Sequence, residues 1–192
     1  MSKLIINGGK RLTGEIEVQG AKNSVLPILA ATVLCRGVSV IHNCPDLSDV
    51  GAAIKILRHL GCKCSFLNNT VTVNTSTLKC CEIPDELMRE MRSSVMFLGA
   101  ILGRCKRASI STPGGCELGP RPIDLPISSH AQPGASVREK HGVIDLPAKE
   151  RLRGCEINLS FASVGATENI ILAAVLADGI TVIHNAAKEP EI

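Results

Sequence analysis

Apolar and polar residues follow two periods along the chain, and the periods change in the same order more than once. An apolar stretch of helical character at 24–34 precedes the β-branched run 37–43, which ends in a polar turn. The same succession returns at 167–177 and 179–185, where Gly-Ile-Thr-Val-Ile-His-Asn matches the earlier Gly-Val-Ser-Val-Ile-His-Asn. The pattern predicts a helix followed by a strand at both places.

A third version of this pattern lies between the other two. Residues 91–102 are predicted to form a helix, 108–111 a short strand, and 113–116 the turn. The turns thus recur with a period of about 70 residues, which indicates one structural unit used several times.

The segments after the first two turns also match. The first segment predicts a helix at 49–60 that ends at Gly61, then a hairpin with strands at 63–67 and 70–73. The apolar residues on one face of that helix are Val50, Ile54, Leu57 and Leu60. The unit is therefore helix, strand, turn, helix and hairpin.

The second unit repeats this order less regularly. Its helix is predicted at 123–133, where Pro126 and Pro133 disfavour helical backbone, and its hairpin strands at 136–140 and 143–146. After the third turn the sequence ends where a second helix is expected, so an incomplete third unit is predicted. The predicted fold class is α/β (α+β), built from repeated helix–strand–helix–hairpin units.

Composition narrows the class of protein. The 192 residues, 45% of them apolar, allow one domain with a sizeable core. A net charge of +3 and 2% aromatic residues argue against a nucleic-acid groove. Apolar runs such as 25–35 are shorter than the ~20 residues of a membrane span, and no secretory segment is recognised at the N-terminus. No membrane association and a cytoplasmic location are therefore predicted.

The nine cysteines are typical of a reducing compartment. The pairs at 62/64 and 80/81 lack the spacing of a zinc site, so no metal is predicted. Buried free cysteine behaves as a small apolar residue. The cysteines expected in that role are Cys35, Cys62, Cys64 and Cys105.

The strongest candidate chemistry lies at 113–125. Gly114 and Gly115 permit a sharp bend, and Cys116 places a thiol beside them. Arg121 follows between two prolines, and its guanidinium suits phosphate or carboxylate. The pattern favours chemistry on a phosphorylated substrate, with a glycine turn and an incidental cysteine as the alternative.

These motifs resemble those of the enolpyruvyl transferase family, and in particular its UDP-N-acetylglucosamine 1-carboxyvinyltransferases. The matching stretches are 20–23, 91–94, 113–116, 119–125, 163–169 and 185–192. The resemblance implies an inverse α/β barrel of two domains, each of three repeats, with the active site between them. Because family members are roughly twice as long, residues 1–20 would be a strand pair of a largely absent second domain. Residues 21–192 would be the first domain, truncated in its third repeat.

The resemblance implies transfer of the enolpyruvyl group from phosphoenolpyruvate to the 3-hydroxyl of UDP-N-acetylglucosamine with release of phosphate. This is the first committed step of peptidoglycan synthesis, and no cofactor is expected. Little activity is expected of this chain alone, because the second domain would supply the base and further arginines. Two alternatives remain open: a non-catalytic module that binds the sugar nucleotide, and enolpyruvyl transfer to shikimate 3-phosphate. The oligomeric state is not predicted.

The resemblance also assigns roles to residues. Cys116 matches a proton donor that can form a covalent adduct with phosphoenolpyruvate. Lys22, Asn23 and Arg121 match the phosphoenolpyruvate site, and Asn23 also matches a contact to the sugar nucleotide. The residues matched to the UDP-sugar are Arg92, Pro122, Ile123, Asp124, Leu125, Ser163, Val164 and Gly165.

Structural roles compete with several of these assignments. Lys22 could be a solvated charge at a helix start, and Asn23 and Ser163 could be helix caps. Arg92 could form an exposed ion pair with Glu90.

Overall fold

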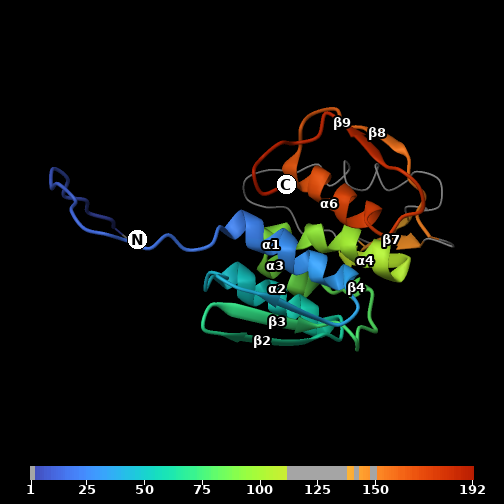
Figure 1. The fold of residues 1–192 in the computed structure, drawn as a ribbon, viewed down its shortest axis with the longest axis horizontal. Helices are drawn as coiled ribbons and strands as arrows, with labels where there is room; N and C mark the ends of the chain where they lie inside the picture. Colours follow the sequence, from blue (N-terminus) through green and yellow to red (C-terminus); the bar gives the residue numbers. More distant parts are fainter. Residues whose placement is uncertain (1–2, 112–137, 141–142, 148–150) are drawn as a thin grey trace.

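The computed structural model describes residues 3–111, 138–140, 143–147 and 151–192. The helices are α1 (Lys22–Ala31), α2 (Ser48–His59), α3 (Asp85–Glu90), α4 (Phe97–Cys105) and α6 (Val164–Ala174), with 3-10 helices η1 (Thr32–Leu34) and η2 (Arg92–Met96). The strands are β1 (Val38–Ile41), β2 (Lys63–Leu67), β3 (Thr70–Asn74), β4 (Glu82–Ile83), β5 (Arg107–Ser111), β6 (Arg138–Lys140), β7 (Val143–Pro147), β8 (Glu156–Asn158) and β9 (Val182–His184). In Figure 1, α1, α4 and α6 cross the middle of the molecule, with β2 and β3 below them and β8 and β9 above.

The sheets confirm that the fold is built from repeated units. The first sheet has the antiparallel order β1-β3-β2, and the second has the order β4-β5-β7-β6. In the second sheet β5, β7 and β6 take the places of β1, β3 and β2, while β4 adds a parallel strand beside β5. In the third unit, β8 likewise runs parallel to β9. The predicted α/β class is confirmed.

The first unit closely follows the sequence pattern. Helix α2 begins and ends one residue earlier than predicted, and the four apolar residues on its predicted face are all buried. Gly61 follows it with a φ of +97°, which suits a helix C-terminus. The hairpin turn at Asn68 and Asn69 has both residues in the left-handed region, as a two-residue turn of this kind requires.

The prediction of one continuous helix at 91–102 is wrong. Met91 is extended, with a φ of −142°, and separates α3 from η2. The buried Ser94 hydroxyl donates to the Met88 carbonyl at 3.0 Å, and such a side-chain bond offers the backbone an alternative to the helix. The helix predicted at 167–177 in fact begins three residues earlier, at Val164. The sequence pattern did not predict α3, β4 and β8.

The expectation that Cys35 is buried is also wrong. Cys35 is exposed, because the chain leaves η1 in an extended conformation at this residue. Cys62 is buried as expected, whereas Cys64 and Cys105 are only partly buried.

Close packing of α4 on α6 joins the second unit to the third. A Cβ atom added at Gly99 would lie 2.2 Å from the Asn169 carbonyl oxygen, so only glycine fits there. Asn169 in turn accepts a hydrogen bond from the Gly99 N–H at 2.9 Å through Oδ1. The main core includes apolar residues of α4 and Leu172 of α6, and a smaller apolar cluster consists of Ile157, Leu159, Ala166 and Ile170.

The segment 3–20 extends away from the rest of the molecule, with no helix or strand (Figure 1). Its large apolar side chains are exposed, among them Leu4, Ile6, Leu12, Ile16 and Val18. The division at residue 20 between two domains stays a prediction. None of the helices that the structure describes has the length and apolar character needed to cross a membrane.

Candidate functional site

The predicted site residues fall into two groups. Lys22, Asn23, Ser163, Val164 and Gly165 are described, and they form the starts of α1 and α6. Arg92 lies in η2, although its side chain is not described. The predicted site residues outside the described ranges are Cys116, Arg121, Pro122, Ile123, Asp124 and Leu125.

A close backbone contact positions the start of α1. A Cβ atom at Gly20 would lie 2.2 Å from the Asn43 carbonyl oxygen, so this position accepts only glycine. The chain then enters α1 through Ala21, whose carbonyl accepts from the Ser24 and Val25 N–H groups. The turn after β1 thus fixes where the first helix begins.

Neither Lys22 nor Asn23 has the purely structural role that competed with its predicted binding role. Lys22 is not simply a solvated charge, because its Nζ lies 2.5 Å from Oδ2 of Asp49 in the first turn of α2. Asn23 is not a cap, since Ala21 occupies the cap position and no side chain caps the helix. The Asn23 side chain is exposed and available to a ligand.

The start of α6 carries a side-chain cap. The Ser163 Oγ accepts from the Ala166 N–H at 3.3 Å, which confirms the expected capping role. The Thr167 hydroxyl donates to the Ser163 carbonyl and accepts from the Ala187 N–H. These bonds hold the segment after β9 against the first turns of α6.

The two helix starts present unused backbone donors. Within the described residues, the N–H groups of Lys22, Asn23, Val164 and Gly165 have no hydrogen-bond acceptor. Such groups at a helix N-terminus favour anions. Both helices pack on α4 or its neighbours, and both begin on the left side in Figure 1. Each helix start therefore suits a negatively charged group of a ligand.

Glu168, one turn into α6, is a functional candidate that the sequence patterns did not single out. It is 7% exposed and has no hydrogen-bond partner among the described residues. Burial, and then the nearby carboxylates of Glu191 and Glu189, raise its pKa to about 7. A group that exchanges a proton near neutral pH is typical of functional sites. The available signal was a single charged residue in a helix whose other residues are apolar or uncharged.

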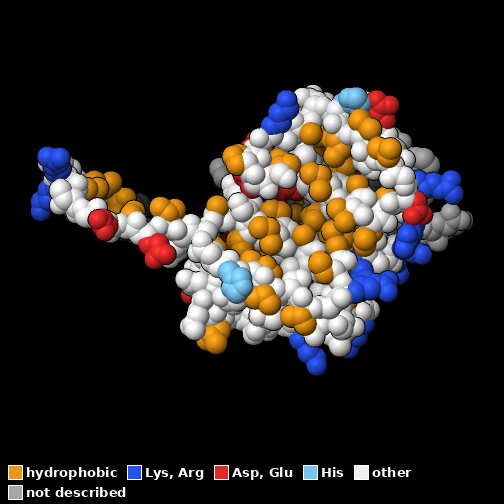
Figure 2. Space-filling view, in the orientation of Figure 1, with side chains coloured by type: hydrophobic (Ala, Val, Ile, Leu, Met, Phe, Trp, Pro, Cys, Tyr) orange, Lys and Arg blue, Asp and Glu red, His pale blue; other side chains and the backbone are white. Residues whose placement is uncertain are grey.

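An apolar surface adjoins these helices. Figure 2 shows apolar side chains gathered over the region where Figure 1 draws α1, α4 and α6. Exposed apolar residues of these helices include Ile28 and Ile171, with Val175 directly after α6. In the part of the chain that the structure describes, no group of three or more His, Cys, Asp or Glu residues is arranged to hold a metal ion.

Comparison with known proteins shows which family this chain resembles. A UDP-N-acetylglucosamine 1-carboxyvinyltransferase 2 from Caldanaerobacter subterraneus is 59% identical over 192 residues, which is all of this chain and 46% of that protein. A UDP-N-acetylglucosamine 1-carboxyvinyltransferase from Chlorobaculum parvum is 48% identical over 194 aligned residues, again 46% of its length. The chain therefore spans about half the length of these curated relatives, and the resemblance seen in the motifs is confirmed.

Solved structures agree on the fold. The enolpyruvyl transferase NikO from Streptomyces tendae matches with a TM-score of 0.81 and 25% identity, over 96% of this chain and 43% of NikO. The EPSP synthase from Acinetobacter baumannii matches with a TM-score of 0.72 and 18% identity, over 93% of this chain and 42% of the synthase. The family model of EPSP synthase (3-phosphoshikimate 1-carboxyvinyltransferase) matches residues 6–192. This chain belongs to the EPSP synthase family.

Proposed function

We propose that this chain is the N-terminal part of an enzyme that transfers the enolpyruvyl group of phosphoenolpyruvate to the 3-hydroxyl of UDP-N-acetylglucosamine. The observation that carries the proposal is the 59% identity, over the entire chain, to a relative named for this reaction. The starts of α1 and α6 support it, because both substrates are polyanions and both helices offer unused N–H donors there.

The described residues would bind rather than transform the substrates. Lys22 and Asn23 would hold phosphoenolpyruvate, and Asn23 would also reach the sugar nucleotide. The backbone of Val164 and Gly165 would hold the diphosphate, with Ser163 keeping the helix start in place through its cap. To engage phosphate, Lys22 would share or leave its ion pair with Asp49.

The chemical step would rest on Cys116 and Arg121. Protonation at carbon 3 of phosphoenolpyruvate creates positive charge at carbon 2, which the sugar hydroxyl attacks as it gives up its proton to a base. Loss of a proton from carbon 3 and departure of phosphate from carbon 2 then restore the double bond of the enolpyruvyl group. In the proposal Cys116 supplies the proton that carbon 3 gains, and Arg121 holds the phosphate together with Lys22. Arg92 and residues 122–125 would lie along the UDP-sugar.

The proposed enzyme has a second domain, to which residues 1–20 would belong as a strand pair. The exposed apolar side chains of this segment support that arrangement, since they lack an apolar partner on the described part of the chain. A cleft closed by two domains stabilises transition-state charge from both walls. The 192-residue chain alone is therefore expected to bind the sugar nucleotide and to turn over little substrate.

Two measurements test the proposal. Calorimetry should detect binding of UDP-N-acetylglucosamine by this chain, and phosphate release from both substrates should appear in a protein of the relatives' full length that contains it. Lys22→Ala should lower activity of that longer protein about 100-fold. Lys55→Ala is the matched control, because Lys55 is also exposed and ion-paired, with Glu90 at 2.7 Å, but lies outside the proposed site. Equal effects of the two substitutions would contradict the role of Lys22.

Transfer to shikimate 3-phosphate is the second candidate, favoured by the match of the EPSP synthase family model. The much higher identity to the UDP-N-acetylglucosamine enzymes argues against it. Competition between the two acceptors in the phosphate-release assay distinguishes the candidates. A third, non-catalytic role requires binding of the sugar nucleotide without turnover in the longer protein.

The proposal also places the enzyme in the cytoplasm, at an early step of peptidoglycan synthesis. Both the location and the step are inferred from the proposed substrates. The binding and phosphate-release measurements therefore test the basis of this inference.

A further inference from the structure

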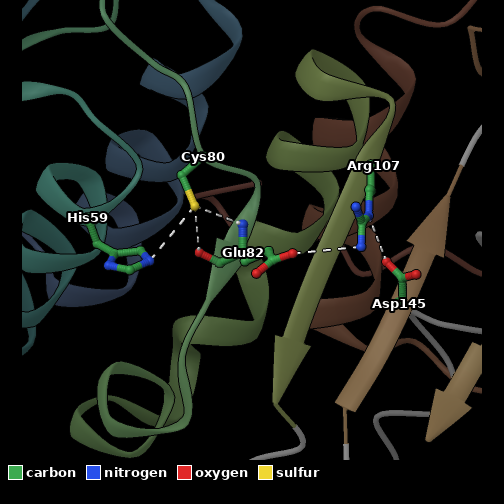
Figure 3. Close-up of polar contacts among 5 residues, drawn as sticks. All are labelled: His59, Cys80, Glu82, Arg107 and Asp145. Atoms are coloured by element: carbon green, nitrogen blue, oxygen red, sulfur yellow. Dashed lines mark hydrogen bonds and ion pairs between the residues drawn. The ribbon is translucent and has the colours of Figure 1, made fainter.

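One thiol outside the proposed site has an imidazole against its sulfur. Cys80 lies between the first sheet and β4, and its Sγ is 3.9 Å from Nε2 of His59, the last residue of α2 (Figure 3). The sulfur accepts from the Glu82 N–H at 3.4 Å, and the thiol can donate to the Glu82 carbonyl at 3.6 Å. Cys80 is partly exposed and His59 is exposed, so a small molecule can reach both.

The backbone holds this pair in place from two sides. The Lys79 and Cys80 N–H groups both donate to the Leu60 carbonyl, directly after His59. On the other side Glu82 begins β4, which pairs with β5. The backbone around Cys80 is therefore fixed next to the end of α2 by hydrogen bonds and next to β5 by strand pairing. This keeps the Cys80 thiol near the His59 imidazole.

An ion network keeps negative charge away from the thiol. The Glu82 carboxylate lies 3.7 Å from Arg107, whose Nε is 3.1 Å from Oδ1 of Asp145. Figure 3 shows the Glu82 carboxylate directed toward Arg107 and away from Cys80. A thiolate at Cys80 would thus meet an N–H group and an imidazole rather than a carboxylate.

The other described cysteines are in different surroundings. Burial raises the pKa of Cys62 to about 11, and burial is also the largest cause of the raised pKa values of Cys44, Cys64, Cys81, Cys105 and Cys155. Cys35 is exposed but has no imidazole in contact among the described residues. Of the cysteines in the described ranges, Cys80 alone combines access with a base.

We propose that Cys80 is a thiol–disulfide exchange site, where a low-molecular-weight disulfide forms a mixed disulfide with His59 as the proton acceptor. The Cys80 proton passes to Nε2 of His59, in the tautomer that carries its own proton on Nδ1. The Cys80 sulfur then attacks one sulfur of the disulfide and breaks the S–S bond. The other half leaves as a thiolate and takes the proton from His59, so protons and electrons balance without another oxidant.

Oxidised glutathione is the probe, added to the 192-residue chain at neutral pH, and mass spectrometry of the peptides measures the rate at each cysteine. Exposure alone predicts that Cys35 reacts faster than Cys80. The proposal predicts that Cys80 reacts at least about tenfold faster than Cys35. A faster or equal reaction at Cys35 would overturn it.

Substitution of the base gives the second test. His59→Gln should slow modification of Cys80 about tenfold and leave Cys35 unaffected. His42→Gln is the matched control, because His42 is another exposed histidine and contacts the Thr70 hydroxyl rather than a thiol. Both substitutions are at the surface, and circular dichroism checks that the chain stays folded. An unchanged Cys80 rate in His59→Gln, or an equal loss in both variants, would also overturn the proposal.

Discussion

Glu168→Gln should stabilise the fold at high pH and leave its stability nearly unchanged at low pH. The glutamate is buried, lacks a hydrogen-bond partner among the described residues, and lies near two other carboxylates. Its pKa is raised from 4.5 to about 7, chiefly by burial. Ionisation is therefore easier in the unfolded chain than in the folded one.

The sign and size of the effect follow from this difference. Below pH 4.5 the group is protonated in both states and contributes no pH dependence. Between the two pKa values only the unfolded state loses the proton, so folding stability falls by about 1.4 kcal/mol per pH unit. Above pH 7 the loss is complete, at about 3 kcal/mol. Glutamine cannot ionise, so Glu168→Gln should recover this amount.

Urea unfolding at pH 4.5, 7 and 9 measures the effect. The increase in the free energy of unfolding should be near zero at the lowest pH and greatest at the highest. In thermal unfolding at the highest pH, the melting temperature should rise by about 6 to 12 °C. Glu189→Gln is the control, because that exposed side chain contributes only a lesser part of the change. A gain that is the same at all three pH values would show that glutamine packs better, and would refute the electrostatic explanation.

Substitutions at four other positions test the helix contacts by urea unfolding. Gly99→Ala should destabilise the fold by about 1–3 kcal/mol, because its Cβ would lie 2.2 Å from the Asn169 carbonyl oxygen. Gly51→Ala, in α2 with open space around it, should instead stabilise by up to about 1 kcal/mol. Asn169→Ala should cost about 1–3 kcal/mol, since it leaves the buried Gly99 N–H without an acceptor. Ser163→Ala should cost about 1 kcal/mol through the lost cap, and a glycine there should recover most of it.

The repeat could be predicted from sequence because the units have the same residue types at positions that need the same backbone conformation. Asn43 and Asn185 end corresponding strands, and both adopt the left-handed region, with φ of 53° and 57°. Local period and turn chemistry were sufficient for α2 and its hairpin, since neither depends on distant contacts for its type. The family motifs could be recognised for the same reason.

The parts that sequence patterns missed depend on contacts between distant residues. Strand β4 is two residues long and exists because it pairs with β5, which lies more than twenty residues further along the chain. The ion pair of Lys22 with Asp49 joins two helices and has no periodic signal. The imidazole partner of Cys80 belongs to His59, 21 positions earlier in the chain, and also has no periodic signal. The candidate site could be predicted as a set of residues, but not as a network of partners.

The start of α6 brings a proposed anion site and a buried carboxyl into one helix, so the two must influence each other. Val164 and Glu168 are four residues apart, about 6 Å along the helix axis. Two like charges at that distance repel by about 3 kcal/mol at an effective dielectric constant of 20. An anion bound at the free N–H groups therefore favours the neutral form of Glu168, and the neutral form favours the anion. UDP-N-acetylglucosamine should bind with proton uptake near pH 7, seen as a binding enthalpy that varies with the ionisation enthalpy of the buffer. Glu168→Gln should remove that variation without preventing binding, and proton uptake that persists in this variant would assign the proton to another group.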